Sequence, residues 1–204
     1  MEAGDALLIV DVQNDFVSGS LAIEGSEAII PVINALMPRF ALVVLAQDWH
    51  PAGHVSFASA HPGAAHGGAV STPYGTQRVF HDHCVQGTAG AEFAPGLDTG
   101  RAALIIRKGT RREVDSFSAF HENDRVTGTG LAGYLRARGV RRVYCGGLSR
   151  YGCVKASAEG ARREGFEVFM VEGASAGRTI DGTESMERSL AEQGIRWVSP
   201  RALD

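Results

Sequence analysis

Six short, continuously apolar runs constrain the fold of this chain more than any other feature. They cover residues 6–10, 41–46, 103–106, 143–145, 166–171 and 195–198. Runs without polar alternation are typical of strands that are covered on both faces. Helical patterns lie between several of them, with apolar stripes such as Ile30, Ile33 and Leu36. This alternation predicts a three-layer α/β/α fold around a central, mostly parallel sheet of about six strands.

Length and composition fit one domain without a nucleic-acid or membrane partner. The 204 residues have a formal net charge of −3 and a hydrophobic fraction of 44%, so we expect a single core over residues 1–204. There is no basic excess of the kind that binds nucleic acid, and no apolar run approaches the ~20 residues of a membrane helix. Three cysteines without a framework spacing, and an acidic N-terminus unlike a signal peptide, predict a cytoplasmic protein.

Four residues with chemical potential lie at or just past the ends of predicted strands: Asp11, Asp48, Lys108 and Cys153. In an open parallel sheet, ligands bind beyond the carboxyl ends of the strands. The shared placement therefore predicts that these side chains converge. The Gly- and His-rich stretch 50–99 is weakly periodic, and we expect it to form an excursion on the same side of the sheet.

Cys153 is the strongest single indication of chemistry. It lies between an apolar strand pattern at residues 143–145 and a helical pattern over residues 154–164. The N–H groups and the dipole at a helix N-terminus favour thiolate over thiol. A buried structural cysteine is the ordinary alternative. The presence of Asp11 and Lys108 at the ends of other predicted strands favours Cys153 as a nucleophile instead.

Asp48 and His50 form a pattern suited to a metal ion. They are two residues apart after a strand, so in extended backbone both side chains point the same way. His54 and His83 lie downstream. One carboxylate and two imidazoles, completed by water, suit Zn²⁺, Fe²⁺ or Mn²⁺. A solvated loop is the commoner origin of an Asp-x-His pattern alone, and the surplus of histidines leaves the ligand set open.

Asp11 and Lys108 give weaker signals when each is taken alone. A carboxylate at the end of a strand, near an apolar floor, can carry a proton, although a loop cap is the plainer explanation. A strand-end lysine close to a thiolate would stabilise negative charge, whereas most lysines are surface residues. Phe16 and Phe80 are candidates for the walls of an aromatic pocket, and core packing explains either one equally well.

Several stretches spread over nearly the whole chain occur together in a characteristic order. They are Asp11-Val12-Gln13-Asn14-Asp15-Phe16, Gln47-Asp48-Trp49-His50-Pro51, His54-Val55-Ser56-Phe57, Asp82-His83-Cys84-Val85-Gln86-Gly87-Thr88, Lys108-Gly109, and Gly147-Leu148 with Cys153-Val154-Lys155-Ala156. In these stretches the chain resembles the nicotinamidase/pyrazinamidase branch of the isochorismatase-like cysteine hydrolase superfamily. The resemblance implies a Rossmann-like α/β fold and a hydrolase that converts nicotinamide, a small amide, to nicotinate and ammonia.

The resemblance also implies roles for individual residues. Asp11 would take the proton of Cys153, Lys108 would hold carboxylate and thiolate in register, and the thiolate would form a thioester. Backbone N–H groups of Ser149 and Cys153 would hold the oxyanion, with a cis peptide bond expected between Ser149 and Arg150. A homo-oligomer is compatible with the resemblance.

A divalent metal ion is the cofactor that the resemblance implies, with zinc preferred over iron or manganese. Its ligands would be Asp48, His50 and His83, with His54 as a further candidate. The ion would bind the pyridine nitrogen and orient the ring. The two phenylalanines named above would flank that ring.

The nucleophile loop departs from the pattern Gly-Leu-Ala-Thr-Asp-Tyr-Cys-Val of the family. Ser149-Arg150-Tyr151-Gly152 replaces its central residues. Arg150 and Tyr151 are therefore bulky neighbours of the nucleophile and candidate substrate-binding residues. Before the downstream metal block, the common Trp-Pro-Asp-His becomes Phe80-His81-Asp82-His83, which keeps an aromatic residue and adds a polar one.

Alternatives to nicotinamide hydrolysis stay open at the level of sequence. A related cysteine amidase could act on another small amide, whose carboxylate Arg150 would bind. A catalytically silent binding module on the same fold is a second alternative, although it would have no need of Asp11, Lys108 and Cys153 together. A hydrolase that uses the metal without a covalent step is a third.

Overall fold

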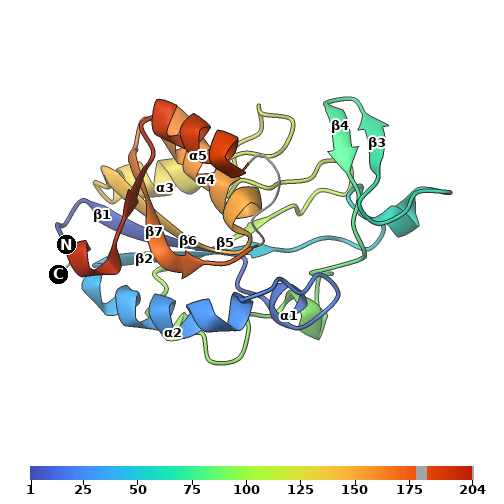
Figure 1. Cartoon of the computed structure of the whole chain (residues 1–204). Helices are drawn as coiled ribbons and strands as arrows, with labels where there is room; N and C mark the ends of the chain where they lie inside the picture. The colour runs from blue at the N-terminus through green and yellow to red at the C-terminus, as the bar shows by residue number, and fades with distance from the viewer. Residues whose placement is uncertain (178–182, 204) are drawn as a thin grey trace.

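The computed structural model describes residues 1–177 and 183–203. Its centre is a six-stranded sheet in the order β5-β2-β1-β6-β7-β8, and every neighbouring pair is parallel (Figure 1). The strands are β1 (Asp5–Val10), β2 (Leu42–Asp48), β5 (Leu104–Lys108), β6 (Arg142–Gly147), β7 (Glu167–Ser175) and β8 (Arg196–Val198). The predicted fold class is confirmed, and each apolar run of the sequence forms one of these strands.

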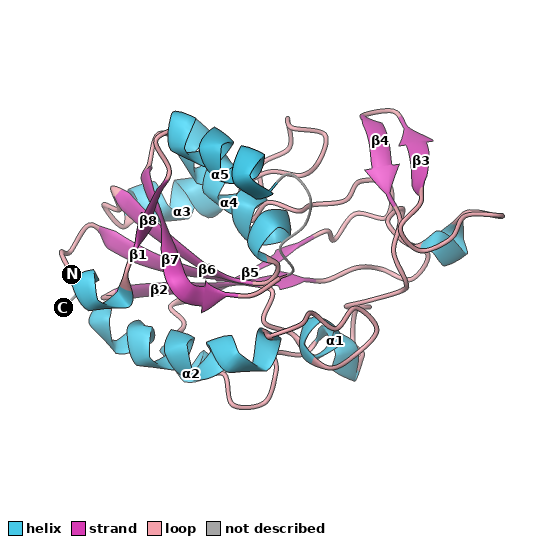
Figure 2. Cartoon of the chain, in the orientation of Figure 1, coloured by secondary structure: helices cyan, strands magenta, loops and turns pink. Residues whose placement is uncertain are grey.

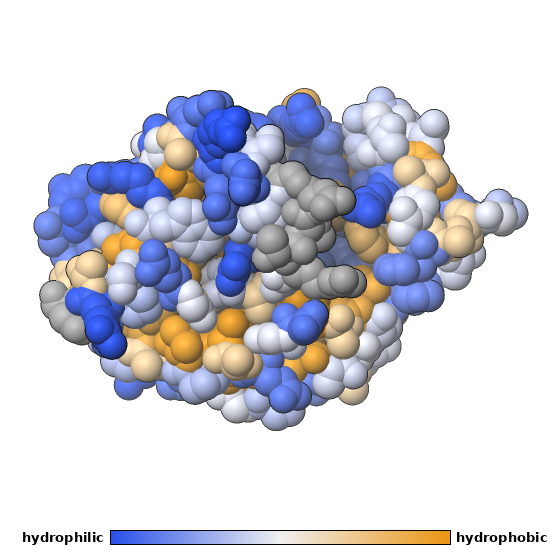
Figure 3. Space-filling model, in the orientation of Figure 1, coloured by the Kyte–Doolittle hydropathy of each residue, from blue (hydrophilic) through white to orange (hydrophobic). Residues whose placement is uncertain are grey.

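Helices cover both faces of the sheet and make the outer layers. Figure 2 shows α1 (Asn14–Val17) and α2 (Ser26–Leu36) on one side, and α3 (Leu131–Ala137), α4 (Lys155–Arg163) and α5 (Thr183–Glu192) on the other. In the same orientation, hydrophobic residues gather along α2 and hydrophilic ones over α5 (Figure 3). Short helical turns complete the described chain: Met37–Arg39, Ala58–Ala60, Ala89–Ala91, Thr99–Arg101, Arg150–Val154 and Pro200–Leu203.

The core lies on both sides of the central strands. In β1, Leu7 and Ile9 pack with Ile33 of α2. Leu8 belongs to the opposite cluster, with Ala158 of α4. Each of these leucine and isoleucine side chains contributes roughly 1.5–3 kcal/mol when it is fully buried. Because both faces of the sheet are covered, residues 6–10 of β1 are all shielded from solvent, which explains why this run is continuously apolar.

A small antiparallel hairpin stands apart from the main sheet. It consists of β3 (Ala69–Thr72) and β4 (Gly75–Arg78) and lies within the predicted excursion. Sequence patterns do not predict this hairpin, because its strands are short and mostly exposed and have no apolar run. Among the described residues, no helix combines the length and the apolar character needed to cross a bilayer.

Candidate active site

The sheet topology explains why residues far apart in sequence meet. Strands β5, β2 and β1 are neighbours, so their carboxyl ends bring Lys108, Asp48 and Asp11 to one edge. Asp48 and Lys108 are direct register partners. Cys153 follows β6, the other neighbour of β1. Donor atoms of Asp11, Asp48 and Cys153 all lie within 4.8 Å of one another, so the structure brings the four strand-end residues together.

Lys108 is the centre of this group. Its side chain is fully buried, and Nζ lies 2.8 Å from Asp11 Oδ2 and 2.5 Å from Asp48 Oδ1. Nζ also donates to the Ser116 carbonyl at 3.0 Å. Burial alone would lower the pKa of Lys108, but the two carboxylates raise it well above its usual value. The site therefore contains a permanent buried cation between two carboxyl groups.

Asp11 and Cys153 have altered affinities for protons. Burial raises the pKa of Asp11 to about 7, aided by the charge of Asp48 and opposed by Lys108. Burial also raises the pKa of the Cys153 thiol, by more than Lys108 lowers it. The resting group is therefore a thiol, which differs from the thiolate expected at a helix N-terminus. Desolvation outweighs the local dipole here. A carboxylate beside that thiol is placed to accept its proton.

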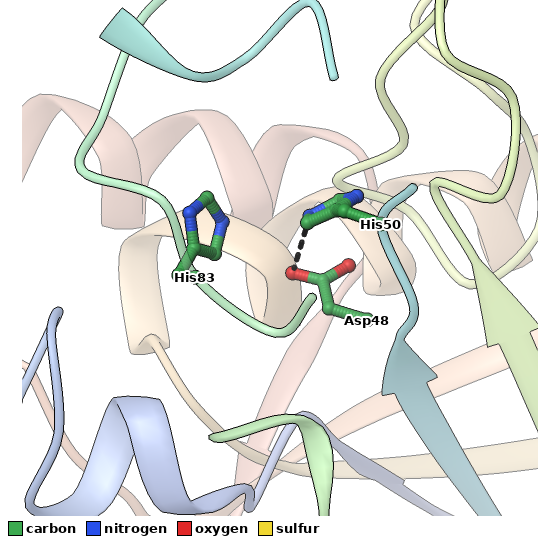
Figure 4. Close-up of side chains that lie close together, drawn as sticks. All are labelled: Asp48, His50 and His83. Atoms are coloured by element: carbon green, nitrogen blue, oxygen red, sulfur yellow. Dashed lines mark ion pairs between the residues drawn. The ribbon is translucent and has the colours of Figure 1, made fainter. Parts of the chain in front are cut away.

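Asp48, His50 and His83 point toward one another (Figure 4), with ligand atoms within 4.8 Å. His50 Nε2 lies 3.5 Å from Asp48 Oδ2. The Nδ1 atoms of His50 and His83 lie 2.9 Å and 2.7 Å from the carbonyl oxygens of Gly109 and His81. A carbonyl can only accept, so Nδ1 is the donor and Nε2 is left with a lone pair. These residues thus fit a divalent ion such as zinc.

The protonation of Asp48 and His83 also suits a cation. Burial would raise the pKa of Asp48, but the charges of Lys108 and His50 hold it well below its usual range. Burial and the neighbouring His50 lower the pKa of His83. Asp48 is therefore a carboxylate and His83 a neutral imidazole near neutral pH, which are the forms that bind metals.

Gly109 allows His50 to reach this position. Its backbone has φ 62°, and a Cβ at Gly109 would overlap the imidazole ring of His50. The glycine therefore serves both the turn after β5 and the close approach of the ring. The Lys108-Gly109 motif is visible in the sequence, but the contact of this glycine with His50 is visible only in the structure.

His54 and His81 lie outside the group of Asp48, His50 and His83. His54 stacks on His50 with ring centroids 4.1 Å apart, and its Nδ1 is 2.7 Å from Ser56 Oγ. Its ligand atom groups with those of His50 and Asp115 instead. Burial lowers the pKa of His54 to about 4. His81 is exposed and stacks on another surface histidine.

Aromatic side chains surround the His83 ring. Phe16 and Phe80 lie with ring centroids 5.6 Å and 5.9 Å from it, in edge-on arrangements. Phe57 was not predicted and is fully buried, 5.4 Å from His83 and 5.7 Å from His50. Phe57 belongs to the His54-Val55-Ser56-Phe57 motif. Its apolar character alone does not show whether it lines the site or packs in the core.

The nucleophile loop contains a cis peptide bond, one residue earlier than expected. It joins Leu148 and Ser149, not Ser149 and Arg150, so the expected position is wrong. The Arg150 N–H donates to the Ala176 carbonyl at 2.8 Å, which fixes the loop against the end of β7. The Ser149 N–H has no acceptor among the described residues.

The side chains of Arg150 and Tyr151 interact away from the buried group around Lys108. Arg150 Nη2 donates to the Ser175 carbonyl at 2.7 Å, and the guanidinium lies 6.0 Å from the Trp197 ring. The Tyr151 hydroxyl donates to Glu187 of α5 at 2.6 Å. These contacts explain how the bulky pair is accommodated beside Cys153, and they favour a structural role over the substrate contact expected from sequence.

Comparisons with known proteins show the family and the fold of this chain. The isochorismatase domain family matches residues 5–200. A nicotinamidase of Acinetobacter baylyi is 44% identical over 200 residues, which cover 96% of this chain and 92% of the relative. A solved nicotinamidase/pyrazinamidase of Acinetobacter baumanii superimposes with a TM-score of 0.96 at 42% identity, over 100% of both chains. A pyrazinamidase of Pyrococcus horikoshii, solved in complex with zinc, has a TM-score of 0.80 at 34% identity, over 96% of this chain and 99% of its own.

Proposed function

This chain belongs to the isochorismatase family, and we propose that it hydrolyses nicotinamide to nicotinate and ammonia through a thioester on Cys153. The relatives described above are nicotinamidases or pyrazinamidases, which supports an amidohydrolase. The observation that carries the proposal is the buried Lys108, held between Asp11 and Asp48 with the Cys153 thiol beside them. A binding protein has no use for a thiol, a proton acceptor and a buried cation in contact.

The chemical steps follow from the protonation of these groups. Asp11 accepts the thiol proton as the sulfur attacks the amide carbon, and the carbonyl oxygen becomes an oxyanion. As the C–N bond breaks, Asp11 returns the proton to the nitrogen, and ammonia leaves a thioester on Cys153. Water then attacks the thioester and gives its proton to Asp11, which returns it to the sulfur as nicotinate departs.

Backbone N–H groups of the nucleophile loop would stabilise the oxyanion. The Ser149 N–H, free of any acceptor among the described residues, is available to donate, and the Cys153 N–H is its proposed partner. Lys108 keeps positive charge beside Asp11 and the sulfur while the proton moves. Phe16 and Phe80 would enclose the aromatic ring of the substrate next to His83.

Asp48, His50 and His83 would hold one divalent ion, with zinc preferred. When bound, the ion supplies a Lewis acid for the ring nitrogen of the substrate and so orients the amide. The hydrogen bonds of the two imidazoles to Gly109 and His81 occupy their Nδ1 atoms, so the Nε2 atoms would be available to hold the ion. The complex of the Pyrococcus horikoshii relative with zinc supports this choice of metal.

Ammonia release from nicotinamide tests the proposed function. We expect zinc-replete protein to release ammonia and nicotinate in equal amounts, with kcat of about 1–10³ s⁻¹. Stripping the metal with a chelator is expected to remove most of the activity, and zinc should restore it. A coupled ammonia assay and chromatography of nicotinate measure both products. If folded, zinc-replete protein releases no ammonia, the proposal that nicotinamide is the substrate is wrong. If the protein stays fully active after the metal is stripped, only the proposed metal requirement is wrong.

Arg150→Ala tests whether the Arg150 guanidinium binds a carboxylate of the substrate. Because Arg150 donates to the Ser175 carbonyl, we expect the same fractional change in kcat/KM for nicotinamide and for a carboxylate-bearing amide such as succinamate. The loss of this partner should also lower the free energy of unfolding by about 1–2 kcal/mol. Kinetics on both amides and urea denaturation measure these effects. A loss confined to the carboxylate-bearing amide would favour the alternative substrate class.

A further inference from the structure

The segment between Asp11 and Phe16 contains a buried amide that the proposed mechanism does not use. Gln13 is fully buried. Its Nε2 donates to the carbonyls of Asp48 and Ala91, and its Oε1 accepts the Asp48 N–H, each at 2.8 Å. The amide of one side chain therefore binds both backbone polar groups of Asp48.

The Gln13 side chain extends the hydrogen bonding of β2 beyond the point where the main chain of β1 turns away. The β1–β2 ladder ends at Val10 and Ala46, and the chain turns at Asp11, where φ is 54°. The last strand residue, Asp48, would then have its backbone groups unpaired on this side, in a buried position. The Gln13 amide supplies the missing donor and acceptor, much as a neighbouring strand would. The orientation of the Asp48 carboxylate thus depends on Gln13.

Asp15 acts in the same way on the second block of the site. Its Oδ2 accepts the backbone N–H of Cys84 at 2.7 Å. Cys84 directly follows His83 and has φ 46°, a conformation that a non-glycine residue rarely adopts without support. The same carboxylate fills the space where a Cβ of Gly90 would lie. Asp15 therefore holds the turn from which the His83 imidazole projects.

We propose that Gln13 and Asp15 are positioning residues of the metal site, and that they orient Asp48 and His83 through backbone hydrogen bonds. The inference rests on the proposed metal site. It assigns a role to the polar residues between Asp11 and Phe16, since one short segment then places the proton carrier, an aromatic wall and two metal ligands together. Ligand supports of this kind usually contribute 10- to 100-fold to metal affinity.

Gln13→Met tests the proposal against a closely matched control. Gln47 is also buried, and its Nε2 donates to the same Ala91 carbonyl at 2.9 Å, but its side chain binds no backbone group of Asp48. Zinc Kd of each metal-free, full-length protein is measured by competition with a chromophoric chelator. We expect Gln13→Met to weaken zinc binding about 10- to 100-fold and Gln47→Met to leave it near the wild-type value. Excess zinc should restore kcat in Gln13→Met.

The unfolding free energy of the metal-free variants shows whether a change in zinc Kd comes from misplaced metal ligands or from a general loss of stability. Equal zinc Kd for Gln13→Met and Gln47→Met would overturn the role of Gln13, as would a kcat loss that excess zinc does not repair. A wild-type protein that binds no zinc would overturn the metal proposal itself, and this inference with it, whereas nicotinamide hydrolysis is scored separately by ammonia release.

Asp15 provides an independent arm if Gln13→Met does not fold. Asp15→Ala removes the acceptor for the Cys84 N–H, whereas Asp15→Asn keeps an oxygen that can accept it. We expect zinc Kd to rise in Asp15→Ala and to stay close to wild type in Asp15→Asn. The same Kd in both variants would overturn the role of Asp15.

Discussion

Replacing Cys153 with alanine is expected to reduce kcat/KM for nicotinamide at least about 10³-fold. The sulfur is the proposed nucleophile toward the amide carbon, and without its thiol the neighbouring Asp11 has no proton to accept in that first step. Alanine leaves the buried ion pairs and the metal ligands intact, so folding and zinc binding should persist. Ammonia release and zinc titration of the same preparation separate lost chemistry from lost structure.

Cys145→Ala is the matched control for the nucleophile. Cys145 is fully buried in β6, and burial raises the pKa of its thiol to about 12, which makes it a poor nucleophile near neutral pH. This variant should retain activity. Mass spectrometry of acid-quenched turnover should find an acyl adduct on Cys153 in wild type and none in Cys153→Ala. Zinc-dependent hydrolysis that survives in Cys153→Ala would instead favour the metal hydrolase without a covalent step.

Lys108→Met is expected to have the largest effect on stability. It leaves Asp11 and Asp48 buried without the cation that both contact. Removal of one partner from a buried ion pair typically costs about 3–5 kcal/mol, because the remaining charge has no compensation. We therefore expect a loss of this size in the free energy of unfolding, together with loss of ammonia release. Urea denaturation of metal-free protein measures the first effect.

Lys155→Met is the control for Lys108→Met. Lys155 forms an i,i+4 ion pair with Glu159 on α4, near the protein surface, and such pairs contribute about 0.3–0.5 kcal/mol. A stability change in Lys108→Met as small as that of Lys155→Met would contradict the buried-cation account. Adding Asp11→Asn to Lys108→Met should recover part of the loss, because it removes one uncompensated carboxylate, so the two changes will not be additive.

The strands, and the edge of the sheet at which the site lies, could be predicted from local patterns. Continuous apolar runs such as residues 6–10 report burial on both faces, and this property belongs to the strand itself. Parallel strands share one carboxyl edge, so Asp11, Asp48 and Lys108 could be placed together without knowledge of the exact strand order. The resemblance to a known family added roles for individual residues, which hydrophobic periodicity cannot indicate.

The choice among similar residues required the tertiary structure. His54 and His83 are equally plausible ligands by type, and only the fold shows that His83 meets Asp48 while His54 stacks behind His50. Arg150 is a candidate substrate contact because it stands beside Cys153 in sequence. Only the tertiary structure shows that its guanidinium donates to the Ser175 carbonyl at the end of β7.

The sequence by itself therefore determined the layers, the parallel sheet and the chemical inventory at its carboxyl edge, because these depend on local burial and on a rule of topology. Only the tertiary structure decided which groups contact each other. It decided that burial keeps Cys153 a thiol with Asp11 beside it, and that Gln13 binds the backbone of Asp48. Both depend on solvent exclusion and on distances between segments that no local pattern reports.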